Sequence, residues 1–495
     1  MTTAPRGAPS GSGNLQVEGP SASEYGTTAQ LLQGEAVWKS GLQNSPEGGQ
    51  REFTPLPPKE EALELIHEAF RDFNAAFPLF DGPSFLRRVE VSYPVINAED
   101  AAWWACLNVV LAFALRLRAL RAFKGPEGDK AMWSYATNAL GVVNELNMSS
   151  DLSAVQALLG MAIVLQGTPY SGICTALLAS AIKSAHRLGI HRDSHEPCGT
   201  QVDREQQKRV FWIAYFLDQD ICVRTGLPPT QYYDDMDVGL PLTTTEPGQG
   251  YTEDIRFFNY RIGLAIIQGH IYSELMSVKA MKKPAEKRSY FIQEFYTMLL
   301  RWKGSLSTDS ETRHCHHRFD MQHPTTVLHA IILQFSYFNS MLTIYLCTGC
   351  ERGVTEENPS TCGILQETGE ALRTTLIVEA RKSIELMKII PLGNNACAWL
   401  LVGSVAPVVT VLLEEVIENP EHPLAHSDLQ LIEPVLEFLE SLARQVEYED
   451  VKRIYDHCTA LTRGAKAVFD ISLEVNRIFP TRTLFRADNT SGVRE

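Results

Sequence analysis

Apolar residues recur at spacings of three and four from about residue 53 to about residue 476. Near the start, Ala62, Ile66, Ala69 and Phe73 follow one another at spacings of four, three and four, with charged residues between them. This spacing places apolar side chains on one face of an α-helix. The alternation typical of strands is nearly absent, and only Tyr233–Leu240 is left for extended structure. The pattern therefore predicts an all-α, multi-helix bundle.

The limits of each periodic run, together with Gly and Pro, predict where the helices begin and end. Gly189 is placed to end one helix in a left-handed conformation, and Val210, Ala214, Leu217 and Ile221 form the stripe of the next. Surface loops are predicted around 349–363 and 419–427. After the entry helix, helices are expected at about 100–121, 128–146, 151–166, 171–188, 203–225, 253–281, 285–304, 324–347, 366–389, 396–413, 429–446 and 449–476.

The two ends of the chain differ in composition from its middle. Residues 1–52 are rich in Gly, Ser, Pro, Thr and Gln and contain few large apolar residues. Such a segment buries too little surface to offset its ordering entropy, so a disordered tail is predicted there, with a second tail at 477–495. The helical domain is predicted at 53–476, with one part at about 54–242 and a C-terminal part at about 250–476.

The net charge and the cysteine spacing indicate which partners and which cellular compartment to expect. The formal net charge of −15 over 495 residues opposes unaided binding to duplex DNA, because such binding requires Lys and Arg to neutralise phosphates. Ten cysteines are scattered without a repeating spacing, which favours reduced thiols in the cytosol or nucleus. The uncharged run Ala396–Leu413 contains Pro407 and lacks flanking basic clusters, so we interpret it as a buried core helix. Membrane attachment through it is the alternative, and no membrane partner is expected.

Three clusters of cysteine, histidine or aspartate residues are candidate metal, redox or acid-base sites. Cys347 and Cys350 have the spacing of a redox or zinc pair, with Cys362 nearby, but they follow an apolar helix rather than a βαβ unit. The run His314–His317, with His323 downstream, lies in a polar connection. Asp234, Asp235 and Asp237 follow a turn-rich segment without an identifiable partner base. Phosphate-loop, nucleophile-elbow and zinc-protease motifs are missing. The sequence predicts no enzyme, catalytic residue, metal ligand or cofactor site.

The segment Asp203–Pro241, with its strings Lys208–Trp212 and Asp235–Pro241, resembles the regulatory domain of fungal transcription factors, also called the middle homology region. It is preceded by Leu188–Asp193, and similar strings upstream begin near residue 54 and include Ala76–Phe80 and Leu152–Gly167. The resemblance thus runs over about 54–242. Two positions depart from the family pattern: Gln219 stands where the family often has Arg, and residues 231–233 replace a stretch that usually contains Ile. We predict mainly a fold-determining role for the matching residues, which are Arg209, Phe211, Trp212, Tyr215, Asp218, Arg224, Gly226, Pro228, Asp237 and Pro241.

The resemblance implies a nuclear regulator of RNA polymerase II genes for metabolism or secondary-metabolite biosynthesis. Family members normally carry a zinc binuclear cluster of six cysteines, yet residues 1–105 contain no cysteine. Zinc is therefore expected only if such a module is encoded upstream of Met1 in a truncated gene model. Otherwise the chain would regulate without contacting DNA itself.

The expected partners are the transcription machinery or coregulator proteins. A small-molecule effector between helices and a homodimer are left open. DNA is expected only through the missing module or through a partner. The second alternative is a metal-dependent or catalytic helical protein that uses one of the clusters named above.

Overall fold

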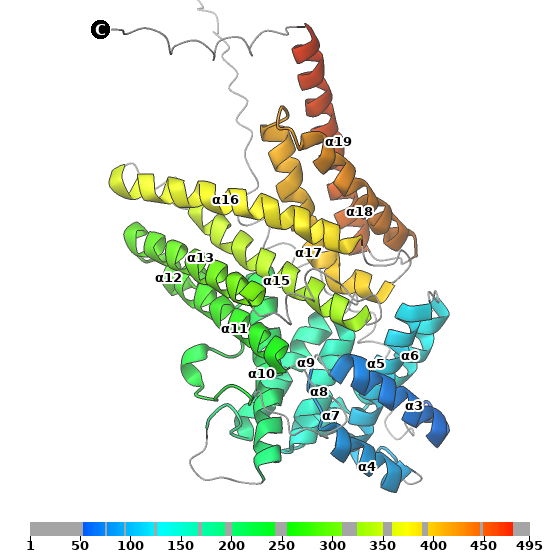
Figure 1. Ribbon diagram of the computed structural model, residues 1–495. Coiled ribbons are helices and arrows are strands. Elements are labelled where there is room, and N and C mark those ends of the chain that lie inside the picture. The colour runs from blue at the N-terminus through cyan, green and yellow to red at the C-terminus, as the bar shows by residue number, and fades with distance from the viewer. Residues whose placement is uncertain are drawn as a thin grey trace, which may run out of the picture.

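Long helices pack against one another in the computed structural model of the chain (Figure 1). The structure describes residues 53–478, apart from 75–76, 94–95, 123–125, 167–170, 194–199, 243–254, 309–323, 350–358, 389–394 and 446–448. No strand occurs in this described part of the chain, and the all-α prediction is confirmed. The predicted tail 1–52, and residues 479–495 of the predicted second tail, lie outside the described residues.

The helices fall into three successive groups along the chain. The first group is α3 (Lys59–Ala69), η1 (Phe70–Asn74), α4 (Gly82–Ser92), α5 (Ala101–Ala122), α6 (Pro126–Leu140), α7 (Val143–Met148), α8 (Leu152–Leu165) and α9 (Ser171–Arg187). The second is α10 (Gln201–Thr225), η3 (Tyr233–Asp235), α11 (Ile255–Ile271), η4 (Tyr272–Met276), α12 (Val278–Met281) and α13 (Ala285–Thr308). The third is α15 (Pro324–Gly349), α16 (Pro359–Met387), α17 (Asn395–Glu418), α18 (Ala425–Gln445) and α19 (Glu449–Ile478).

Two predicted helices are interrupted in the structure. The helix expected at 128–146 ends at Leu140, and a short turn separates it from α7. The helix expected at 253–281 breaks at Ser277, whose backbone leaves the helical region and whose Oγ accepts a hydrogen bond from the amide of Ala280 at 3.1 Å. A side chain that caps a new helix in this way is invisible to apolar spacing.

Two predicted loops are shorter than expected. The loop at 349–363 gives way to α16 from Pro359, a residue that favours the first turn of a helix because its missing N–H needs no partner there. The loop at 419–427 gives way to α18 from Ala425. In place of the extended structure left open for 233–240, the chain forms the short 3-10 helix η3 followed by an irregular segment.

A connected apolar core extends from α3 to α19. Helix α5 packs against α3, α6 and α8, and α10 packs against α8, α9, α11 and α15. Helix α17 packs against α16, α18 and α19 and also reaches α5, so the first and third groups share this core. Figure 1 shows α10 below the long pair α15 and α16 and to the left of the N-terminal helices. The division of the domain near residue 242 stays a prediction.

Several apolar helices lie inside the bundle. Ala101–Arg118 and Ala330–Gly349 are long and apolar enough to cross a membrane, but 78% and 67% of these windows are buried in the fold. The run predicted as a core helix at 396–413 belongs to α17, where Val405, Val408 and Leu412 are fully buried. Each of these helices thus has other helices, rather than lipid, around most of its length.

Gly160 sets the approach of α8 to α5. A Cβ atom at this position would lie 2.5 Å from Cγ1 of Val109, closer than carbon atoms can pack. We expect Gly160→Ala to lower the free energy of unfolding by about 1–3 kcal/mol through overpacking. Urea unfolding followed by circular dichroism of the helices would measure this change.

Gly464→Ala is the matched control, because Gly464 is an exposed helical glycine with no atom within 4 Å of its added Cβ. It should be neutral or stabilising by up to about 1 kcal/mol. Equal unfolding midpoints for Gly160→Ala and the unmodified chain would contradict this account.

Candidate functional site

Helix α10 is the centre of the family-like region, and its middle is enclosed on all sides. Thr200 caps its first turn in a reciprocal capping box with Asp203. From Val210 to Gln219 every residue is buried, because α8, α9, α11 and α15 surround this stretch. The sequence predicted one buried apolar stripe on this helix, whereas the structure buries every side of it between Val210 and Gln219. Four of these ten consecutive buried positions carry polar side-chain atoms, which are costly to bury without hydrogen-bond partners within the fold: Trp212, Tyr215, Asp218 and Gln219.

The segment that follows α10, residues 226–242, runs back along the helix and is called the returning segment here. Gly226 adopts a left-handed conformation with φ of 71°, which ends the helix and reverses the chain at low steric cost. Nε1 of Trp212 donates to the carbonyl of Gly239 at 3.1 Å, and the amide of Leu242 donates to Oε2 of Glu205 at 2.9 Å. Side chains of α10 thus supply hydrogen-bond partners to a backbone without regular structure of its own.

Asp218 and Gln219 hold the other end of the returning segment. Oδ2 of Asp218 accepts from the amides of Thr230 and Gln231 at 2.8 and 3.0 Å, and Nε2 of Gln219 donates to the carbonyl of Gln231 at 2.9 Å. Burial raises the pKa of Asp218 from 3.8 to about 6, while the backbone hydrogen bond from Gln231 acts in the opposite direction. Because Glu205, Trp212 and Gln219 are spaced by seven, they share one face of α10, so the contacts run along a single line.

The end of α9 is joined to the same segment. Gly189 is left-handed with φ of 73°, as the sequence predicts for the end of this helix. The amide of Asp237 donates to the carbonyl of His191 at 3.3 Å, and Oδ1 of Asp237 accepts from the amide of Asp193 at 2.7 Å. Burial lowers the pKa of His191, and the neighbouring His186 acts in the same direction, with ring centroids 4.8 Å apart. Asp237 therefore serves as a backbone partner in this loop.

The remaining family-matching residues divide by burial. Phe211 and Tyr215 are buried in the core, and Pro241 is buried with its carbonyl 3.4 Å from Nδ2 of Asn259. Arg209 is half-buried on α10, and Pro228 is exposed. Arg224, also exposed, forms an ion pair with Asp220 at 3.0 Å. These positions describe where the residues lie, and their fold-determining role stays a prediction.

Arg261 on α11 is a buried cation that the sequence reading missed. Its side chain lies over the rings of Phe216 and Phe77, with its guanidinium carbon 4.1 and 4.5 Å from their centroids. Nη1 has no hydrogen-bond acceptor among the described residues. Burial lowers the pKa of Arg261 to about 10, and Asp220 acts weakly in the opposite direction. Stacking on an aromatic ring contributes about 0.5–2 kcal/mol. Removing an ion from water costs several kcal/mol, so the two rings do not fully offset its burial.

Of the three candidate metal or redox clusters, only Asp234, Asp235 and Asp237 lie wholly within the described residues. Asp234, Asp235 and Asp237 are exposed, and no three His, Cys, Asp or Glu side chains converge on a metal-sized space among the described residues. Cys347 is half-buried near the end of α15, while Cys350 and the side chain of Cys362 are outside the described residues. The run His314–His317 is also outside them.

Comparison with known proteins identifies the family to which this architecture belongs. Residues 70–320 match the family model described as "Fungal specific transcription factor domain". This chain belongs to that family. The match includes α10 and the returning segment, so the resemblance stated from the sequence is confirmed.

The relatives of this family member are named as transcription factors. Over 434 residues it is 37% identical to the "ABC-transporter-regulating transcription factor" of Aspergillus oryzae, covering 85% of this chain and 48% of that protein. It is 30% identical to the "Fusaridione A cluster transcription factor fsdR" of Fusarium heterosporum, covering 84% of this chain and 78% of that protein. The chain thus spans about half the length of the Aspergillus factor. The solved K. lactis CBF3 core aligns at 14% identity with a TM-score of 0.45, covering 92% of this chain and 99% of that one.

Replacing Asp218 should separate its two properties, hydrogen bonding and ionisation. Asp218→Ala leaves two amides of the returning segment without an acceptor, and each lost partner costs about 1–3 kcal/mol of unfolding free energy. Asp218→Asn keeps an acceptor oxygen and should cost less. Thermal unfolding of the three proteins at pH 7 would measure this order, and an Asp218→Ala protein as stable as the parent would contradict it.

The raised pKa of Asp218 also predicts a dependence on pH. The folded-state pKa of about 6 lies above the ordinary value of 3.8, so the folded protein binds the extra proton between these limits. The stability contributed by protonated Asp218 is therefore lost as the pH rises through about 6. Relative to Asp218→Asn, the parent should gain thermal stability between pH 7.5 and 5.5. A constant difference between the two proteins across this window would contradict the assignment.

Proposed function

We propose that this chain is the regulatory part of a nuclear transcription regulator that acts on RNA polymerase II genes. The observation that carries the proposal is its family membership, together with 30% identity over 78% of the length of a named transcription factor. The helical core adds support, since it offers a scaffold for protein and effector contacts. The signature residues are proposed to stabilise this scaffold rather than to contact a partner.

The class of target genes is proposed from the names of two relatives. One is named for regulating an ABC transporter and the other for a fusaridione A cluster. Genes for secondary-metabolite biosynthesis, or other metabolic genes, are therefore the proposed targets. Both names refer to proteins longer than the matched region, so this assignment remains a proposal for the present chain.

DNA contact is proposed to come from a zinc-cluster module or a partner rather than from this helical domain. The net charge of −15 supports this, because a negative surface repels phosphates. The proposed partners are coregulators or components of the transcription machinery, with a small-molecule effector between helices. The chain is proposed to have no catalytic activity of its own, and zinc would enter only with a cluster module.

A reporter assay tests the proposal directly. The chain is fused to a foreign DNA-binding module in a fungal host, upstream of a reporter with intermediate basal expression, so that activation and repression are both visible. We expect reporter output to change several-fold relative to the DNA-binding module alone. Asp218→Ala should reduce this effect by weakening the fold, while Gly464→Ala should leave it unchanged. Unchanged output at equal nuclear amounts of the fusion would count against a regulatory function.

A further inference from the structure

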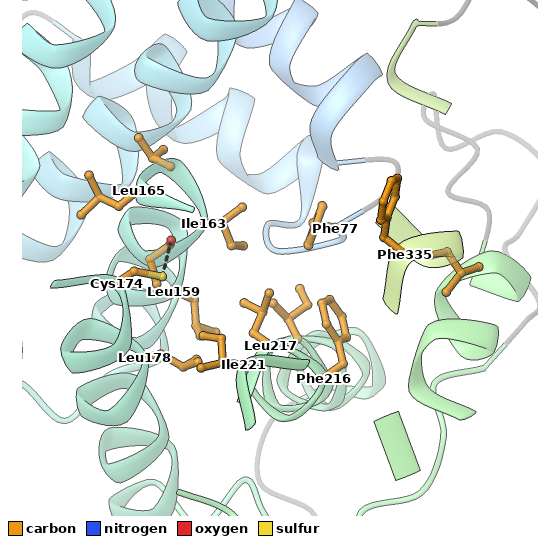
Figure 2. Close-up of a cluster of buried hydrophobic side chains, with 14 of the residues drawn as sticks. Phe77, Leu159, Ile163, Leu165, Cys174, Leu178, Phe216, Leu217, Ile221 and Phe335 are labelled. Carbon is orange, nitrogen blue, oxygen red and sulfur yellow. Dashed lines mark hydrogen bonds between the residues drawn. The ribbon is translucent and has the colours of Figure 1, made fainter. Parts of the chain in front are cut away.

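The last turns of α19 carry large apolar side chains that the rest of the described chain does not cover. In the core, apolar side chains of different helices cover one another, as Figure 2 shows for Ile163, Leu178 and Leu217, which come together from α8, α9 and α10. Helix α19 packs against α17 and α18, but its C-terminal turns extend beyond both of them at the top of Figure 1. The apolar residues exposed there are Ile471, Leu473, Val475 and Ile478, with 61%, 54%, 50% and 67% of their surface accessible.

Five apolar residues of α19 repeat with the spacing by which one helix packs lengthwise on another. They fall into two series with an interval of seven residues, offset by three, which is the a and d pattern of paired helices. Two members of the first series are half-buried, and the other three residues are exposed. These residues are called the α19 stripe here: Leu461, Val468 and Val475 in the first series, and Ile471 and Ile478 in the second.

The α19 stripe is separate from the face by which this helix joins the bundle. Cys458 and Ala465 are fully buried, and the ring of Phe469 stacks on His426 of α18 with centroids 5.8 Å apart. At about 100° per residue, the middle of the α19 stripe lies roughly a third of a turn from the line through Cys458, Ala465 and Phe469. The bundle and a second helix can therefore contact α19 at the same time.

Two charged residues beside the α19 stripe have no ion-pair partner among the described residues. Arg463 and Glu474 are exposed and eleven residues apart, which is about three turns, so both lie on the side of the stripe that faces away from the bundle. Their opposite charges lie toward opposite ends of the stripe. A helix that has the same two charges and runs in the opposite direction would pair each charge with its counterpart. The partner that fits is thus a second copy of α19.

The register of the two helices decides between the antiparallel and the parallel arrangement. When Val468 of each copy packs on Ile471 of the other, antiparallel helices bring Arg463 to within about 3 Å, along the axis, of the level of Glu474. Parallel helices in register place the same two residues about 16 Å apart along the axis and set each charge beside its own copy. Arg477 lies close to the level of Arg463 in the antiparallel pair, but about 60° farther from the stripe than Glu474, so Glu474 is the nearer charge.

We propose that the α19 stripe binds the same stripe of a second copy of this chain, in an antiparallel pair of helices. Ile471 lies near the two-fold axis, where it packs on Val468 of the other copy, and Ile478 packs near Leu461. The exposed apolar side chains thereby lose their contact with water, and the two-fold axis forms each contact twice. The inference goes beyond the regulatory function and does not rest on it, because the association of two chains is measured without a reporter.

Sedimentation velocity and light scattering of the full chain at about 1–100 μM test the proposal. We expect the mass to rise with concentration from that of one chain toward that of two. Ile471→Asp places a charge in the apolar contact and should lower the association constant by roughly tenfold or more. Val278→Asp is the matched control, because Val278 is an apolar residue with 70% of its surface exposed at the start of α12, where an acidic residue is well tolerated. It should associate like the parent.

Charge reversal tests the antiparallel orientation. Arg463→Glu and Glu474→Arg should each lower the association constant by roughly threefold, and the double variant should restore it to within about twofold of the parent. Circular dichroism and thermal unfolding establish that every variant is folded. A chain that stays monomeric over the whole concentration range would overturn the proposal, and so would a dimer that Ile471→Asp leaves intact. A double variant that associates more weakly than both single variants would overturn the antiparallel pairing.

Discussion

The enclosure of α10 imposes the main constraint on this fold. The stretch Val210–Gln219 is buried around the whole circumference of the helix, so its polar side chains have no solvent-facing side and depend on partners inside the protein. Asp218, Trp212 and Nε2 of Gln219 find partners in backbone groups of the returning segment, whereas the hydroxyl of Tyr215 and Oε1 of Gln219 have no partner among the described residues. The same hydrogen bonds satisfy backbone groups of the segment that lie outside its short helix η3. Helix and segment therefore stabilise each other, although neither would be expected to hold this arrangement alone.

In the third group of helices, buried charged side chains are paired with groups of opposite charge, unlike Arg261. Arg381 on α16 forms a two-pronged ion pair with the buried Asp428 of α18, with both distances at 2.8 Å. Glu379 accepts from Nε2 of Gln334 at 2.8 Å, and its pKa is lowered despite burial because Lys303 and Lys382 lie nearby. In these places the fold supplies a partner for each charge. Arg261 differs within the described residues, because its guanidinium stacks on two phenylalanine rings and its Nη1 has no hydrogen-bond partner there.

The sequence predicted the helices well because each one buries apolar side chains at a constant spacing, and the family-like strings located α10 and its returning segment. It did not predict the interruptions at Leu140 and Ser277. At Ser277 a short polar side chain caps a new helix without disturbing the apolar spacing on either side. The partners of Asp218 lie twelve and thirteen residues away, in a segment without periodicity, so the direction of their pairing could not be read from the pattern. Arg261 was missed for a similar reason. A single basic residue in an apolar run is ordinarily taken as solvent-exposed, and only the rings from two distant segments show that it is enclosed.

The departure at Gln219 from the residue often found in the family has a physical consequence for its neighbour. With 1% of its surface exposed, Gln219 supplies the donor that holds the carbonyl of Gln231 but brings no charge. An arginine at this position would place a cation beside Asp218 and would favour the ionised carboxylate. With glutamine there, Asp218 has only neutral donors, among them the amides of Thr230 and Gln231, against its loss of hydration, and burial raises its pKa. The same hydrogen-bonded arrangement can thus be built with or without a buried ion pair, and this chain uses the form whose stability depends on proton binding near neutral pH.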